Sequence, residues 1–398
     1  MFDALIVVVL AGLLGPLLAS GSRPLVPAVV GELLAGAVLG TTGLHVIEAD
    51  TPANTFLYSL GFAMLMLVAG SHVQLDSPGL GAGIRAGVRA LSVVVVAAVP
   101  IGLATGAVLA PSAPVLLFPV LLAGSSAAVA FPVLEERGLL GPRIGTLLAW
   151  IPLADAVTVL LMPLTMLGPD RIPPALAGDV AIGGLTLAAL EGGRRLERSP
   201  WALTLRDRSR SRGWALQLRL TLLVLLGLSL VADKTGGSTL LAGFGAGIVL
   251  ARLRTPERLE VQLSGLAEGF FVPAFFVLLG ARLDFRALAG DPGAIGLAVV
   301  LAAGAIVVHL AGAFAAAPKP RLGYGLAASA QLGLPAAAAS LGLSTGRLSD
   351  AAAAGIVAAG CLTLLPATIG SRRLADALAP AAATPAPTPG PARTNDPS

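Results

Sequence analysis

Cysteine, histidine and charge are all scarce in this sequence. Its 398 residues include one cysteine, Cys361, and three histidines, so no intramolecular disulfide can form and no zinc-type Cys/His spacing occurs. We therefore expect no structural metal and no cofactor. Charged residues make up only 12% of the chain and aromatic residues 4%. Together with 56% hydrophobic residues and a mean hydropathy of +0.87, this excludes an ordinary soluble domain and predicts a polytopic membrane protein.

The charges that are present give a basic balance, with a net charge of +4 and a pI near 10.0. Such a balance can indicate nucleic acid binding. Here, however, the arginines are scattered between apolar runs and have few aromatic residues beside them. A lipid bilayer with a basic cytoplasmic face is the better interpretation, and we expect no nucleic acid partner.

Long apolar runs bounded by Pro, Gly or charge divide the chain. A membrane-spanning helix needs about 17 to 25 mostly apolar residues. Continuous Leu, Val and Ala runs take the place of the alternating pattern of a transmembrane barrel, so the predicted fold is all-α with about 13 transmembrane helices. The thirteen segments lie near residues 2–20, 25–44, 54–71, 83–110, 113–134, 143–168, 174–190, 216–232, 237–253, 263–281, 293–317, 322–342 and 348–370.

The positive residues fall mainly on one side of these spans. Assigned to the nearest loop, 21 of the 26 Lys and Arg follow odd-numbered spans and five follow even-numbered spans. Positive residues favour the cytoplasmic side of short loops, so we expect a cell (inner) membrane protein with its N-terminus outside and its C-terminus cytoplasmic. The densest basic stretch, residues 194–219, is then a cytoplasmic linker that either lies on anionic headgroups or is simply solvated.

Short motifs recur in the same order in both halves of the chain. They shift by seven spans, and because seven is odd the two copies should have opposite orientations in the membrane. Inverted repeats are typical of secondary transporters, with the substrate site at their interface. The matches are SAAVAFP (126–132) with SAQLGLP (329–335), VTVLLMP (157–163) with GCLTLLP (360–366), and ELLAG (32–36) with TLLAG (239–243).

These repeats divide the chain into four expected regions. The last of them is rich in Pro and Ala and is expected to be disordered. The regions are a first repeat with a linking helix at 1–190, a basic cytoplasmic linker at 191–215, a second inverted repeat at 216–370 and a cytoplasmic tail at 371–398.

Prolines interrupt the matching spans five and twelve. Pro132 follows Ser125 and Ser126 in one span, and Pro335 follows Gln331 in the other. Proline removes an amide donor and clashes with the preceding turn, so each alone could be an ordinary kink. Because the two prolines occupy equivalent repeat positions, we expect discontinuous, crossed helices whose ends offer carbonyls and opposing dipoles to an ion.

Four apolar stretches follow one another along the chain: PLVPAVVGELLAGAVLG (24–40), SLGFAMLMLVAGSHVQLD (59–76), AGSSAAVAFPVLEERGLL (123–140) and FFVPAFFVLLGARLDF (270–285). In this order they resemble the motifs of a known family, the Kef-like sodium or potassium/proton antiporters. The resemblance covers about residues 5–370 and involves the membrane domain only. It implies an elevator-type cation/proton antiporter, usually a homodimer, with a dimerisation domain and a mobile core that carries the ion site.

Asp155 stands in the middle of the apolar run AWIPLADAVTVLLMP (149–163). A charged group at membrane depth costs about 2.5 to 3.5 kcal/mol and is usually retained for function. Thr158 lies within one turn on the same face of this helix. The resemblance implies that Asp155 binds proton and cation in turn, with Ser125, Ser126 and Thr158 nearby. The family commonly has Asp, Asn or Gln before this aspartate, whereas this chain has Ala154. The alternative is a protonated Asp155 that hydrogen-bonds a neighbouring helix.

Two more ionisable residues lie inside apolar spans. His309 is the only one between Asp291 and Lys319, and the family resemblance implies a basic, charge-compensating residue at its place, often Lys. A lone histidine on an apolar helix can equally be a packing residue. Glu32 matches a family position, but it could serve helix packing or the dimerisation domain instead.

The expected function is secondary active antiport of sodium or potassium against protons, with proton and cation competing for Asp155. The protein is therefore expected not to be an enzyme. Two alternatives use a similar fold. One is a nontransporting membrane sensor of pH or a ligand that signals through the basic linker at 194–219, and the other is a sodium-coupled symporter of an organic anion.

Overall fold

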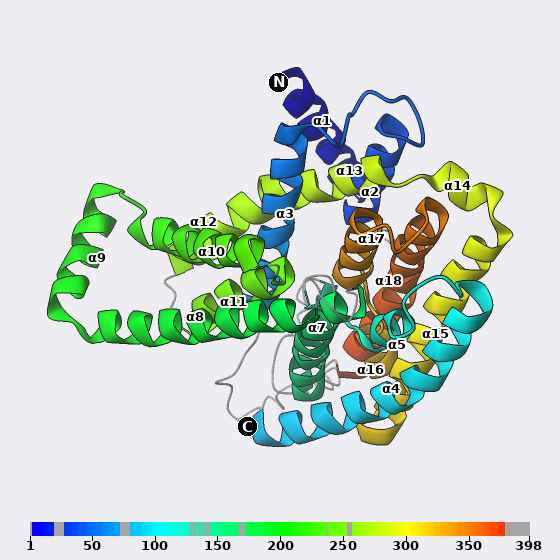
Figure 1. Ribbon diagram of the computed structural model, residues 1–398. Helices are drawn as coiled ribbons and strands as arrows, with labels where there is room; N and C mark the ends of the chain where they lie inside the picture. The colour runs from blue at the N-terminus through cyan, green and yellow to red at the C-terminus, as the bar shows by residue number, and fades with distance from the viewer. Residues whose placement is uncertain are drawn as a thin grey trace, which may run out of the picture.

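The computed structural model describes residues 2–19, 28–71, 80–127, 130, 133–134, 137, 139, 144–166, 172–235, 237–252 and 257–378. Within these ranges the chain forms helices and connecting turns but no β-strand. Figure 1 shows long helices packed side by side, with a helical hairpin that extends from one side of the bundle.

The chain order of the helices follows the expected spans. The first half contains α1 (Phe2–Ala19), α2 (Ala28–Leu39), α3 (Pro52–Ser71), α4 (Leu80–Leu109), α5 (Leu117–Ala123) and α7 (Gly145–Met166). Two connecting helices follow, α8 (Ile172–Arg198) and α9 (Pro200–Arg212). The second half contains α10 (Leu216–Thr235), α11 (Thr239–Arg252), α12 (Glu257–Leu266), a π-helical turn (Ala267–Phe271), α13 (Val272–Arg282), α14 (Phe285–Gly290), α15 (Pro292–Ala316), α16 (Arg321–Ala328), α17 (Gly333–Ser344) and α18 (Asp350–Leu378).

Length and composition make this a multi-pass membrane fold. Nine segments of the described chain are helical, apolar and long enough to cross a bilayer, and three shorter apolar helices accompany them: Leu5–Leu17, Ala28–Leu39 and Thr239–Arg252. Each expected span finds a helix, the fifth being represented by α5 and by residues up to 134 that are only partly described. The prediction of an all-α polytopic membrane protein is confirmed.

The contacts between helices repeat in the two halves. α2 packs on α13 and α3 packs on α11; α4 packs on α7 and α15 packs on α18; α4 packs on α5 and α15 packs on α16. A shift of seven spans pairs α2 with α11, α3 with α13, α4 with α15, α5 with α16 and α7 with α18. This pairing converts the first contact of each pair into the second. Inverted repeats produce this exchange, because each helix keeps its neighbours when the copy is turned over.

Glycines bring the exchanged helix pairs together. The motif GAVLG (36–40) covers the last turn of α2 and the residue after it, and GFGAG (243–247) lies at the equivalent place on α11. A Cβ on Gly36 would overlap the carbonyl oxygen of Val277, and a Cβ on Gly243 would lie 2.7 Å from the carbonyl oxygen of Ala63. Small residues four positions apart allow helix backbones to approach closely in membranes.

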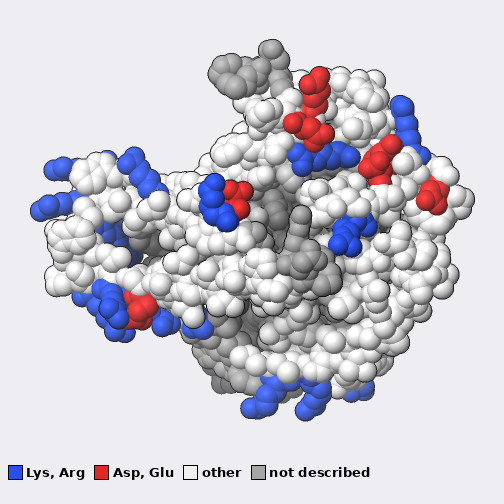
Figure 2. Space-filling model, viewed as in Figure 1, with Lys and Arg blue, Asp and Glu red and all other residues white. Residues whose placement is uncertain are grey.

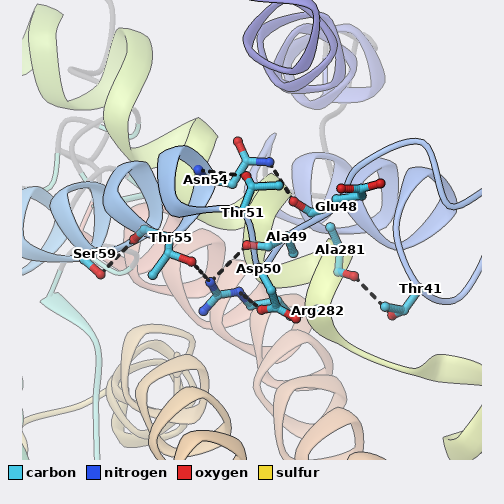
Figure 3. Close-up of polar contacts among 10 residues, drawn as sticks. All are labelled: Thr41, Glu48, Ala49, Asp50, Thr51, Asn54, Thr55, Ser59, Ala281 and Arg282. Carbon is cyan, nitrogen blue, oxygen red and sulfur yellow. Dashed lines mark hydrogen bonds and ion pairs between the residues drawn. The ribbon is translucent and has the colours of Figure 1, made fainter. Parts of the chain in front are cut away.

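The loop at residues 40–51 is fastened to the end of α13 (Figure 3). One guanidinium nitrogen of Arg282 donates to the carbonyl oxygen of Ala49 at 3.1 Å and to Oγ1 of Thr55 at 3.2 Å. The same guanidinium lies 4.2 Å from the ring centroid of Tyr58 on α3. Arg282 therefore joins the loop after α2, the start of α3 and the end of α13 into one unit.

Candidate ion site

Two helices are broken at the centre of the bundle. α5 ends at Ala123 and is followed by three non-helical residues, 124–126. α16 ends at Ala328, and residues 329–332 separate it from α17. α7 packs against both α5 and α16, and α16 packs against α18. These breaks occur in equivalent spans of the two repeats, as expected.

The two breaks bond directly to each other. The amide of Ser126 donates to the carbonyl oxygen of Ala330 at 2.8 Å, and Oγ of Ser125 donates to the carbonyl oxygen of Ala328 at 2.7 Å. Both serines are buried. Backbone groups released by a helix break must find partners at membrane depth, and here each break supplies them to the other.

Gln331 extends this network to a third helix. Its side-chain Nε2 donates to the carbonyl oxygen of Gly124 at 2.5 Å, and its backbone N–H donates to Oγ1 of Thr363 on α18 at 3.0 Å. A small cavity between α5, α15, α17 and α18 is lined by Gln331, Thr363, Pro335 and apolar side chains. The glutamine thus lies inside the break itself.

Asp155 reaches the crossing from α7. Its side chain is buried, with 4% exposure, and Oδ2 accepts a hydrogen bond from the amide of Ala127 at 3.1 Å. The amide of Ala130 donates to the carbonyl oxygen of Ser126 at 2.9 Å. This bond has the spacing of a helical turn and comes directly after the break. The carboxylate therefore lies at a helix N-terminus, where free amides and the helix dipole favour negative charge. Within the described residues no Lys, Arg or His forms an ion pair with Asp155.

Thr158 is buried one turn further along α7, but its hydroxyl bonds to its own helix. Oγ1 donates to the carbonyl oxygens of Ala154 at 2.8 Å and of Asp155 at 3.2 Å. A hydroxyl that donates to a carbonyl keeps lone pairs that can accept. The oxygen of Thr158 is thus an available ligand near the carboxylate, although the structure shows no bond between the two side chains.

His309 lies on α15 and packs on an aromatic ring of α7. Its side chain is fully buried, its Nδ1 lies 2.8 Å from the carbonyl oxygen of Ala305, and its ring stacks on Trp150 with centroids 5.6 Å apart. Nε2 of His309 and Nε1 of Trp150 have no hydrogen-bond partner among the described residues. Trp150 is five residues before Asp155, about 7.5 Å along the helix. In the described structure no hydrogen bond or ion pair joins His309 to Asp155.

The other predicted residues lie away from the carboxylate. Glu32 is buried on α2 against α1, where a Cβ on Gly15 would lie 2.6 Å from its Cγ. Pro335 is the third residue of α17, after the break rather than in it. Pro132 lies outside the described residues.

Sequence reasoning missed three partners of the site. The amide of Ala127 is a backbone group, which no side-chain pattern reveals. Thr363 and Trp150 could have been noticed as a polar residue and an indole inside the apolar helices α18 and α7.

An all-helical membrane protein with inverted repeats, crossed helix breaks and a buried carboxylate at the crossing has the architecture of a secondary transporter. The family that this chain matches, over residues 5–372, is described as sodium/hydrogen exchanger, transmembrane. The chain belongs to the sodium/hydrogen exchanger family.

Several named proteins are similar to this chain. A putative Na⁺/H⁺ antiporter of Bacillus subtilis, YjbQ, is 28% identical over 72% of this chain and 48% of its own length. A Na⁺/H⁺ antiporter of Enterococcus hirae is 25% identical over 65% of this chain and 68% of its own. K⁺ efflux antiporter 2 of Arabidopsis thaliana chloroplasts is 28% identical over 68% of this chain and 24% of its own. The chain thus spans about half the length of the Bacillus relative and less of the plant relative.

The fold is also that of a solved antiporter structure. The sodium proton antiporter MjNhaP1 from Methanocaldococcus jannaschii superposes with a TM-score of 0.61, covering 94% of this chain and 96% of its own, at 17% identity. At this identity the likeness concerns the arrangement of the helices.

Proposed function

We propose that this protein exchanges a monovalent cation, sodium or potassium, for protons by alternating access, and that proton and cation compete for Asp155. The observation that carries the proposal is the burial of Asp155 at the crossed helix breaks with one amide donor and no cationic partner among the described residues. The similar proteins named for Na⁺/H⁺ antiport and for K⁺ efflux support the same activity.

The charge of Asp155 explains how two ions would be coupled. An ionised carboxylate in the membrane interior carries a free-energy cost of a few kcal/mol. Binding either a proton or a monovalent cation makes the site neutral. If the helices that hold Asp155 change sides only when the site is neutral, each passage carries one ion or the other, and cation flux in one direction drives proton flux in the opposite direction.

Oxygen atoms around the crossing are the proposed cation ligands. Ser125, Ser126 and Thr158 supply hydroxyl groups and Gln331 supplies its amide oxygen, all on the elements that meet Asp155. Because the hydroxyls of Ser125 and Thr158 now donate to carbonyl groups, their lone pairs rather than their protons would face the ion.

The wider arrangement is part of the proposal. We place the N-terminus outside and the C-terminus in the cytoplasm, and we propose a homodimer. Glu32, at the contact of α1 and α2, is assigned to helix packing in the first repeat, away from the ion site.

Replacing Asp155 by asparagine tests the proposal. Asp155→Asn keeps the size and accepts from Ala127, but an amide cannot exchange a proton. In proteoliposomes with a pH-sensitive dye inside, we expect the wild type to move protons when sodium or potassium is added outside, and the variant to lose at least nine tenths of that rate.

Asp179→Asn is the matched control. Asp179 is also a buried carboxylate, on α8, and its Oδ1 accepts from one amide, that of Ser238 at 2.7 Å. Its variant should retain exchange because Asp179 lies on the connecting helix. Proton movement by Asp155→Asn at the wild-type rate would refute the proposed role. A wild type that moves neither ion would favour the sensor alternative, and uptake of an organic anion with sodium would favour the symporter.

A further inference from the structure

The connection between the two repeats concentrates positive charge. Residues 194–219 contain eight arginines and only two acidic residues, Glu197 and Asp207, so this stretch carries a net charge of +6, whereas the whole chain carries +4. Figure 2 shows this charge gathered over α9 and the adjoining ends of α8 and α10, at the left of the view. Nothing in the proposed ion exchange uses it.

α9 is held in a defined position by its C-terminal corner. Gly213 has a positive φ of 67°, and its amide and that of Trp214 both donate to the carbonyl oxygen of Ser209. Oγ of Ser209, the buried side chain of this helix, accepts from the amide of Leu216 at 3.2 Å. In Figure 1 α9 runs across the ends of α8 and α10 instead of continuing either of them.

A surface cavity of about 40 Å³ opens between α9, the start of α10 and α12. Arg206 and Arg210 lie one turn apart on α9 and both line it. Gln217 and Gln262 add amide groups. No acidic residue belongs to the described lining, so the side chains around it offer guanidinium and amide donors suited to a phosphate group.

The surroundings of the cavity suit a membrane surface better than open water. Trp201 is 67% exposed and Trp214 39% exposed, one near each end of α9, and Arg212 lies 5.3 Å from the ring centroid of Trp214. Tryptophan and arginine gather at the level of lipid headgroups. α8 and α10 then continue away from α9 with exposed leucines, such as Leu187 and Leu223, that lipid chains can cover.

We propose that this cavity binds the phosphate of an anionic phospholipid headgroup, with α9 lying on the membrane surface and its two tryptophans among the headgroups. Arg206 and Arg210 would contact the phosphate, and the remaining arginines would attract the anionic leaflet. An anion from solution would account for the arginines but would leave the exposed indoles and leucines in water.

Tryptophan quenching by brominated lipids tests this site in the full-length protein. Trp201 and Trp214 are exposed, whereas Trp150 is fully buried, so the first two report on lipid at α9. In mixed micelles the wild type should be half-quenched at a several-fold lower fraction of brominated phosphatidylglycerol than of brominated phosphatidylcholine. The double substitution Arg206→Gln/Arg210→Gln should bring the two fractions together, and Arg206→Lys/Arg210→Lys should keep part of the preference.

Arg194→Gln/Arg198→Gln is the matched control. It removes the same charge from the same stretch, one turn apart on α8, without touching the cavity. This variant should retain most of the preference. Equal quenching of the wild type by both lipids would overturn the proposal, and so would equal losses in the two glutamine variants. Loss of the preference on adding inorganic phosphate at constant ionic strength would also overturn it, because the cavity would then take a soluble anion.

Discussion

His309 is the residue for which a charged role and a packing role predict different pH profiles of the proposed exchange. Its ring is stacked on Trp150, which precedes Asp155 on α7. Full burial disfavours the positive imidazole, but where His309 does bind a proton we propose that its charge favours the ionised state of Asp155 through space. His309→Phe keeps a ring against the indole but cannot carry charge. Without the positive charge, the protonated form of Asp155 is favoured, and the cation must displace a proton that is bound more tightly. Half-maximal exchange should therefore move to higher pH by up to about one unit, equivalent to about 1.4 kcal/mol.

The pH profile of exchange for the wild type, His309→Phe and His309→Ala at matched protein content measures this shift. A packing role predicts that the Phe variant behaves as the wild type and that only the Ala variant, which leaves a space beside Trp150, loses activity through instability. An alkaline shift in both variants is the outcome expected for a charge effect. Coincident wild-type and Phe profiles would make His309 a packing residue.

At the scale of helices, the close contact of α2 with α13 should leave no room for a side chain at Gly36. Gly36→Ala adds one Cβ that overlaps the carbonyl oxygen of Val277. In an open helix this exchange would stabilise by up to about 1 kcal/mol through helix propensity. Here overpacking should dominate and destabilise the protein by about 1 to 3 kcal/mol. The measurement is the fraction that remains monodisperse by size-exclusion chromatography after heating in detergent.

Gly227→Ala on α10 supplies the comparison, because a Cβ there meets nothing within 4 Å. That variant should be neutral or slightly more stable. Gly243→Ala on α11 repeats the test in the second half, where the added Cβ would lie 2.7 Å from the carbonyl oxygen of Ala63. Equal stability of the Gly36 and Gly227 variants would mean that the α2–α13 contact relaxes at no cost.

Over the whole molecule, hydropathy and charge predicted the helices because each span is a local, long apolar run. Asp155 stood out for the same reason, as a lone carboxylate in such a run. The matching spans predict the crossed breaks, but not the bonds that join them, since these are backbone bonds such as that from Ser126 to Ala330. Pro335 is expected inside the break, but it lies in the first turn of α17, where an amide donor is not needed. It therefore marks the point at which the helix restarts after the break.

The orientation of the molecule in the membrane is the remaining property that its charges predict. In Figure 2 most Lys and Arg lie at the left and lower edges of the visible face, and most acidic residues lie towards the top and right. Because positive residues favour the cytoplasmic side, α9 should be inside and the α10–α11 turn outside. In a Cys361→Ala background, Lys234→Cys, whose native side chain is 75% exposed, should react in intact cells with an impermeant maleimide. Arg210→Cys on α9 should react only after the membrane is opened. Labelling of position 210 but not of position 234 from outside would reverse the topology and place the proposed lipid site on the opposite leaflet.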